Sequence, residues 1–150
     1  IFGLMKRLLL ILMLVSVAFG ASAKKKPTTE YGKGTGKVYI FGVCQQLTDS
    51  VVYITSINMV DSIDLEKKTK FLPFRSEFSL QLKEYMEGKM QKRNQTACVF
   101  YSANRKKLSK KFYKIKKRFL DNSYTKVVML DQERFQFQHP LSPVTHEAAQ

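Results

Sequence analysis

The 150-residue sequence lacks tryptophan and contains only two histidines, two cysteines and four prolines. His139 and His146 lie in or beside a proline-bearing C-terminal stretch, where a mobile base would not hold a nucleophile at hydrogen-bond distance. The histidines and cysteines also lack the spacing of a zinc site. We therefore find no catalytic, cofactor-binding or metal-binding motif, and we expect a protein that is not an enzyme.

A long hydrophobic run is also missing. Residues 8–19 are apolar except for Ser16, and these twelve residues fall short of the roughly 20 that span a bilayer. Lys6 and Arg7 precede the run, and the Ala-Ser-Ala of residues 21–23 puts small side chains at the −3 and −1 positions of a cleavage site. This pattern predicts a signal peptide over residues 1–23, with Met5 as its start, rather than a membrane anchor. No cysteine lies near the cut, so we expect a soluble, exported protein without a lipid anchor, in the periplasm or outside the cell.

Acidic residues are scarce, which leaves a formal net charge of +14, or +12 once Lys6 and Arg7 leave with the leader. A surplus of this size attracts polyanions, and in an exported protein these are lipopolysaccharide, acidic glycans and peptidoglycan. Nucleic acid is not an expected partner, because no recognised nucleic-acid-binding motif is present and an exported protein rarely meets a genome.

The basic residues concentrate in one segment. No acid lies between Glu87 and Asp121, and nine of the fourteen positions 105–118 are basic. An apolar stripe at 3.6-residue spacing predicts a helix over residues 105–120. The candidate polyanion contacts on this helix are Arg105, Lys106, Lys107, Lys110, Lys111, Lys114, Lys117 and Arg118. The alternative interpretation is an ordinary solvated helix face.

The two cysteines leave two states open. Oxidising compartments permit a disulfide between Cys44 and Cys98. Cys98 also lies in the apolar stretch Ala97-Cys98-Val99-Phe100, where a free thiol packs as a small apolar side chain.

Hydrophobic periodicity predicts strands over residues 38–44, 51–57, 97–101 and 126–130, with a short last strand around Phe135 and Phe137. It predicts helices over 76–87, capped by Ser76, and over 105–120. Residues 24–36 read as a flexible lead-in, 37–138 as a single domain and 139–150 as a disordered tail. We expect an α+β fold in the order β-β-α-β-α-β(-β), with one mixed sheet and both helices packed on one face.

Three stretches carry a resemblance: VYIFGV at 38–43, DSVVYIT at 49–55, and VFY at 99–101 running into the lysine-rich helix. Together they resemble a set of small exported proteins of Bacteroidetes that has no assigned activity. The resemblance covers about residues 37–137 and implies export and a one-domain fold, but no site residues. It also implies O-glycosylation at Asp-Ser followed by an apolar residue, which makes Ser62 and Ser50 candidate acceptors, with Ser62 on a connection and so better placed.

Residues 97–120 are also similar to peptidoglycan-binding sporulation-related repeat domains, although those domains begin strand–helix and this chain begins with two strands. This similarity implies an alternative function, peptidoglycan or glycan binding through an exposed aromatic sheet face. A second alternative is an envelope enzyme with an unrecognised site, which would need a deep pocket with converging titratable groups. The leading hypothesis is a non-catalytic binding or structural module of the envelope, with the basic helix as its contact surface.

Overall fold

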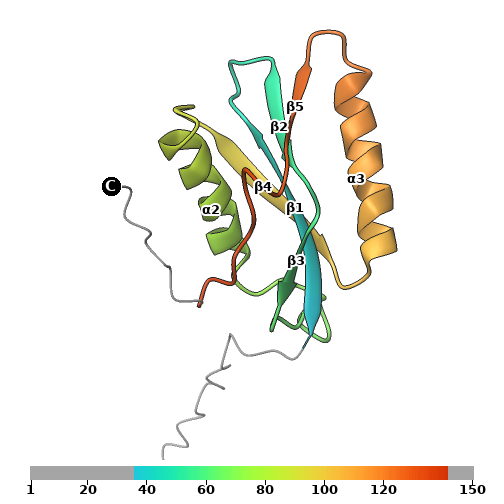
Figure 1. Ribbon diagram of the computed structural model, residues 1–150. Helices are drawn as coiled ribbons and strands as arrows, with labels where there is room; N and C mark the ends of the chain where they lie inside the picture. Colours follow the sequence, from blue (N-terminus) through green and yellow to red (C-terminus); the bar gives the residue numbers. More distant parts are fainter. Residues whose placement is uncertain (1–35, 142–150) are drawn as a thin grey trace, which may run out of the picture. The chain divides into compact units, whose positions relative to one another are not determined.

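A computed structural model describes residues 36–141 (Figure 1). The predicted signal peptide, most of the lead-in and residues 142–150 of the predicted tail lie outside the described residues. The elements in chain order are β1 (Lys37–Gln45), β2 (Val51–Thr55), β3 (Asn58–Asp61), α2 (Arg75–Gly88), β4 (Thr96–Ser102), α3 (Arg105–Leu120) and β5 (Lys126–Leu130).

Strand β1 is the centre of a five-stranded mixed sheet. It pairs antiparallel with β4 along one edge, and along its other edge first with β3 and then with β2. Strand β2 pairs in parallel with β5. The predicted α+β class, with one mixed sheet and two helices, is confirmed.

Strands β2 and β3 are two halves of one bent strand. Between them, three residues (55–57) lie opposite only two residues of β1 (41 and 42), which makes a β-bulge. At the bulge, the buried Thr55 accepts a hydrogen bond on its Oγ1 from the backbone N–H of Gly42, at 2.8 Å. The bulge interrupts the alternation of side chains between the two faces, so β3 is not among the strands that periodicity predicted.

The two helices lie on opposite faces of the sheet, so the prediction that both pack on one face is wrong (Figure 1). The strand directions explain the arrangement. The β3–α2–β4 and β4–α3–β5 connections each join parallel strands, but the first crosses β1 in one direction and the second crosses back past β1 and β2. Since crossovers of this kind are almost always right-handed, two that run in opposite directions must cover opposite faces.

Each face therefore has its own core. The α2 face is formed by buried side chains of the helix and of alternate sheet positions: Val38, Ile40, Cys44, Tyr53, Val60, Phe78, Leu82, Met86 and Val99. The α3 face is smaller, with Phe41, Val43, Val52, Ile54 and Leu108 buried. No helix of the described residues is long and apolar enough to cross a membrane.

The residues after β5 pack over the α2 face and do not form the predicted last strand. Phe137 contacts Phe78 edge-on, with the ring centroids 6.0 Å apart, and Phe135 contacts Tyr85 at 5.1 Å. The backbone of Gln138 is held by the side chain of Gln81, which donates to its carbonyl at 2.8 Å and accepts from its N–H at 3.0 Å. Phe135 and Phe137 alternate with exposed neighbours because both rings turn into the core. Helix α2 and the residues after β5 cover one face of the sheet, and α3 covers only part of the other.

Candidate functional site

Helix α3 forms where the sequence predicted it. Its N-cap is Asn104, whose side-chain oxygen accepts a hydrogen bond from the N–H of Lys107 at 3.1 Å. The apolar stripe faces the sheet, but only Leu108 is fully buried. The other stripe residues, Phe112, Ile115 and Phe119, are half-buried, so the helix leaves apolar surface open along its contact with the sheet.

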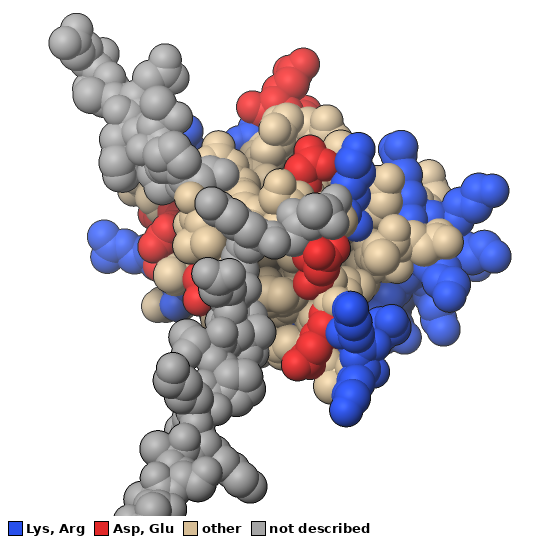
Figure 2. Space-filling view, turned by 90° about the horizontal axis from the view of Figure 1, so that it is seen from below, with Lys and Arg blue, Asp and Glu red and all other residues tan. Residues whose placement is uncertain are grey.

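All eight predicted contact residues on α3 are exposed, and the ninth basic residue, Lys116, is half-buried. In Figure 2, basic side chains crowd the side of the molecule on which α3 lies in Figure 1. The two ion pairs found within residues 36–141, Lys37–Asp61 and Lys83–Glu87, are both outside α3. The α3 cations are therefore not neutralised by acidic side chains of the described part of the chain.

The positive charge of the described residues comes almost entirely from α3. Residues 36–141 contain twenty Lys and Arg and ten Asp and Glu, and α3 holds nine of the twenty cations and no acid. The other described residues, with eleven cations against ten acids, are nearly neutral. Three of the α3 cations occupy its first turn, where the positive end of the helix dipole disfavours them. These charges therefore do not serve the stability of the helix.

A groove of about 590 Å³ separates α3 from β4. Its apolar lining comes from Val43 and Phe100 on the sheet and from Ile115 and Phe119 on the helix, with Cys98 beside them. Its cationic lining consists of Lys110, Lys111, Lys114 and Arg118. The ammonium of Lys111 lies 4.9 Å from the ring centroid of Phe100, which holds one cation directly over the apolar floor.

The cations on the groove side of α3 follow a helical repeat. Lys107, Lys111, Lys114 and Arg118 are spaced by four, three and four residues, which places them in one row along the helix. Three of the four line the groove. The pattern joins a row of cations to an apolar trough.

Large apolar and aromatic side chains are exposed elsewhere on α3 and in the turn after it. Tyr113 and Leu120 on α3 are 66% and 57% exposed, and Tyr124, in the turn after the helix, is 86% exposed. Isolated exposed apolar residues are common on protein surfaces. Because Tyr113 and Leu120 are exposed on the same helix as nine cations, α3 is an amphipathic surface rather than a purely charged one.

Both cysteines are free in this structure. Cys98 is paired with Val43, the neighbour of Cys44, but successive residues of a strand point to opposite faces. Cys44 therefore lies in the core under α2 and Cys98 in the groove under α3. Two side chains that point apart across a sheet cannot be bridged without moving the backbone.

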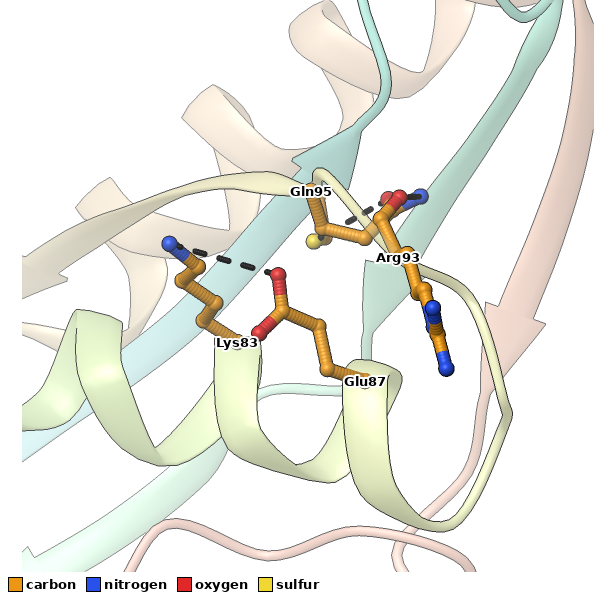
Figure 3. A network of polar contacts seen from close by, with 5 residues as sticks. Lys83, Glu87, Arg93 and Gln95 are labelled. Carbon is orange, nitrogen blue, oxygen red and sulfur yellow. Dashed lines mark hydrogen bonds and ion pairs between the residues drawn. The ribbon is translucent and has the colours of Figure 1, made fainter.

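The surroundings of the two thiols differ. The Cys44 thiol is fully buried and donates to Oε1 of Gln95 at 3.5 Å, next to the Lys83–Glu87 pair drawn in Figure 3. Burial raises its pKa from the ordinary value of 9.0 to about 12, and the nearby Cys98 and Glu87 add to the rise. Desolvation also raises the pKa of the Cys98 thiol, against the opposing charge of Arg75.

The two serines named as glycosylation candidates both lie at the surface. Ser62 follows β3 with a left-handed backbone (φ 63°), and its side chain is exposed. Ser50 is exposed in the turn before β2, and its carbonyl accepts a hydrogen bond from the N–H of Lys126. The modification itself stays a prediction.

Chemistry-bearing residues do not converge elsewhere in the described part of the chain. No group of three or more His, Cys, Asp or Glu side chains there is arranged to hold a metal ion. The ring of His139 lies 6.1 Å from that of Phe74, and its Nδ1 accepts a hydrogen bond from the N–H of Leu141. Among residues 36–141, those that line the groove between α3 and β4 contribute cations, apolar side chains and one thiol, and no carboxylate or imidazole.

Sequence reasoning found the helix and its cations but missed the groove. The usable signals were the period of two in β4, which puts Cys98 and Phe100 on the side away from Val99, and the four-three-four spacing of the cations. The chain matches no family model, no curated protein and no solved structure, so its function is inferred from this geometry.

Proposed function

We propose that this protein is a non-catalytic binding module that contacts anionic surfaces through α3. The observation that carries the proposal is the concentration of nine cations, without an acid or an ion pair, on one 16-residue helix of an otherwise nearly neutral set of residues. Such a surface gains free energy by releasing counterions when it meets a dense array of negative charges.

An ordinary solvated helix face accounts less well for this arrangement. Surface helices usually mix the two signs of charge, because opposite charges four residues apart stabilise a helix and like charges destabilise it. On α3 the like-charge spacing recurs at Lys107–Lys111, Lys110–Lys114 and Lys114–Arg118. An anionic partner that neutralises these side chains would explain why α3 retains several like-charge pairs that destabilise it.

The test is retention on immobilised heparin and on lipopolysaccharide as the salt concentration rises. The wild-type protein should bind at low salt and release steeply as salt screens the contacts. Each Lys or Arg near an anionic surface contributes about 1 kcal/mol. Changing Lys110, Lys111, Lys114 and Lys117 to Gln should therefore weaken binding at least tenfold.

A matched control removes the same charge elsewhere. Lys67, Lys68, Lys89 and Lys92 are exposed and lie outside α3, so their change to Gln lowers the net charge by the same amount. This control should bind nearly as the wild type does. If binding falls equally in the two variants, it depends on the net charge of the protein and not on α3. Salt-insensitive binding to purified peptidoglycan would favour the alternative of a glycan-binding module.

We also propose that the protein is exported, which would bring α3 to lipopolysaccharide, acidic glycans or peptidoglycan. The proposal rests on the short apolar run of residues 8–19 and the small residues 21–23 that follow it. In a bacterial host, N-terminal sequencing of the protein from the periplasmic fraction should begin at Lys24. Recovery from the cytosol with the leader still attached would contradict it.

A further inference from the structure

The groove between β4 and α3 has two kinds of lining, and contact with a polyanion uses only one of them. Cations on the outward face of α3 suffice to hold a charged glycan chain. They leave unexplained an apolar trough of about 590 Å³ directly under Lys110, Lys111, Lys114 and Arg118. That volume is within the range of small-molecule sites, which are mostly apolar with a few convergent polar groups.

We propose that this groove binds one anionic lipid, with an acyl chain on the apolar floor and the charged head group between Lys111, Lys114 and Arg118. This inference rests on the proposed function, because it identifies the anionic surface that α3 contacts as a lipid surface.

The apolar floor of the groove indicates that part of the ligand is apolar. Phe100, Ile115 and Phe119 are only half-buried, and Cys98 is exposed at the same place. The floor therefore keeps apolar surface in contact with water, and an alkyl chain laid along it would remove that surface from water. Sugars and sulfate or phosphate groups alone would not fill it.

The spacing of the groove's cationic rim, formed by Lys111, Lys114 and Arg118, indicates that the other part of the ligand is anionic. Lys111, Lys114 and Arg118 are three and four residues apart, so successive cations are about one helical turn, or ~5 Å, from each other along the helix. Flexible side chains at that spacing can converge on a single phosphate or carboxylate, and charge-assisted hydrogen bonds of this kind are the strong ones.

The lipid source is indicated by the exposed surface of α3 outside the groove. Tyr113, Leu120 and Tyr124 are exposed and do not line the groove. At 3.6 residues per turn, Tyr113 and Leu120 lie on the other side of α3 from the groove cations. Tyrosine and leucine among lysines are typical of protein surfaces that lie at a membrane–water interface, where the apolar body enters the boundary and the charges meet the head groups.

Cys98 provides a direct readout, because it lies in the groove while Cys44 is buried. The rate at which a thiol reagent modifies Cys98 is measured with dodecyl phosphate below its micelle-forming concentration. Inorganic phosphate supplies the head alone, and dodecyl maltoside supplies the same chain without charge. We expect dodecyl phosphate to slow the reaction at least tenfold and each control to slow it less than twofold. Equal protection by phosphate, or by dodecyl maltoside, would overturn the inference.

Variants separate the rim from the rest of α3. Changing Lys111, Lys114 and Arg118 to Gln should abolish protection by dodecyl phosphate. Changing Lys106, Lys116 and Lys117 to Gln removes the same charge from the same helix outside the groove lining and should leave protection within twofold. Equal loss in both variants would overturn the assignment of the head group to this rim.

A variant with a bulky side chain in the groove distinguishes failure of this inference from failure of the proposed function. Cys98→Phe places a ring on the floor of the groove without changing any charge, and Cys98→Ser leaves the floor as it is. On vesicles with one third anionic phospholipid at 0.5 M NaCl, Cys98→Phe should bind at least fivefold more weakly than Cys98→Ser, while both keep the same heparin retention. If the two variants bind vesicles equally, the groove does not bind lipid, and the proposed role of α3 in contacting anionic surfaces is unaffected. Protection of Cys98 by a polyglutamate peptide but not by dodecyl phosphate would also overturn this inference, in favour of a peptide.

Discussion

Cys44 and Cys98 lie on neighbouring strands, one pairing position apart, yet their side chains point to opposite faces of the sheet. This geometry predicts that the native protein has one reactive thiol and one inert thiol. A thiol reagent should modify Cys98 in native protein and Cys44 only after denaturation, which mass spectrometry of the two peptides would show. Mild oxidation should produce no internal disulfide. Rapid formation of a Cys44–Cys98 bridge would mean that β1 and β4 can shift relative to each other.

The buried Cys44 thiol also predicts how stability responds to alkaline pH. Its pKa rises from 9.0 to about 12 on folding, so the folded state holds the proton more tightly than the unfolded state does. The contribution to stability is complete below pH 9 and is lost as the pH rises from 9 toward 12. At pH 10.5 the loss should be about 2 kcal/mol, at 1.36 kcal/mol for each pKa unit.

Other groups titrate in the same pH range, so the comparison is with Cys44→Ala. Urea unfolding at pH 8 and pH 10.5 should show a smaller fall in stability for the variant than for the wild type. Parallel pH dependences in the two proteins would show that the thiol is not the group responsible.

Gly42 predicts an overpacking effect in the core under α2. A Cβ at this position would stand 2.5 Å from Cδ2 of Leu82 and 2.9 Å from Cζ of Phe137, both closer than carbon atoms pack. Gly42→Val should therefore destabilise the protein by about 1–3 kcal/mol, measured by chemical denaturation. Replacing the opposing ring by a smaller side chain with Phe137→Leu should recover part of the lost stability, because it removes the contact at 2.9 Å.

Gly88 is the matched control for this prediction. A Cβ there meets nothing within 4 Å, and the residue ends α2. Gly88→Ala should stabilise the protein by roughly 0.5–1 kcal/mol, since alanine loses less backbone entropy in a helix than glycine does. A loss of stability in Gly88→Ala similar to that of Gly42→Val would make the cause general intolerance of glycine replacement rather than crowding.

Local pattern was sufficient to predict most elements of this fold. Helix α3 was predicted at its observed bounds, because Leu108, Phe112, Ile115 and Phe119 recur at the helical period. Two boundaries were missed for local reasons. Helix α2 begins after Phe74, in a left-handed conformation (φ 58°), and not at a Ser76 cap, and β3 follows a bulge that hides its alternation.

The groove could not be predicted, because it depends on how the strands are ordered. Cys98 and Phe100 come to face α3 only because β4 lies beside β1 and because the second crossover returns over the opposite face from the first. Periodicity within β4 shows that Phe100 and Val99 point apart, but not which helix covers which side. The rim cations, by contrast, were identified from the sequence, since charge and helical spacing are local properties.

The like charges of α3 predict a conflict between binding and stability. Pairs four residues apart, such as Lys107–Lys111 and Lys110–Lys114, each destabilise a helix by about 0.2–0.5 kcal/mol. Changing Lys110, Lys111, Lys114 and Lys117 to Gln should therefore raise the free energy of unfolding by about 1 kcal/mol at low salt, while it weakens binding to anions. Thermal unfolding at 20 mM NaCl should show the variant melting a few degrees above the wild type.

Salt provides the control for this effect, because dissolved ions screen exposed charges from each other. At 0.5 M NaCl the two melting temperatures should converge, mainly through a rise in that of the wild type. The variant with Lys67, Lys68, Lys89 and Lys92 changed to Gln, none of them on α3, should gain much less at low salt. If neutralising the α3 lysines instead lowers the melting temperature at every salt concentration, these residues contribute to folding. Their retention would then need no anionic partner to explain it, and the proposed function would lose its main support.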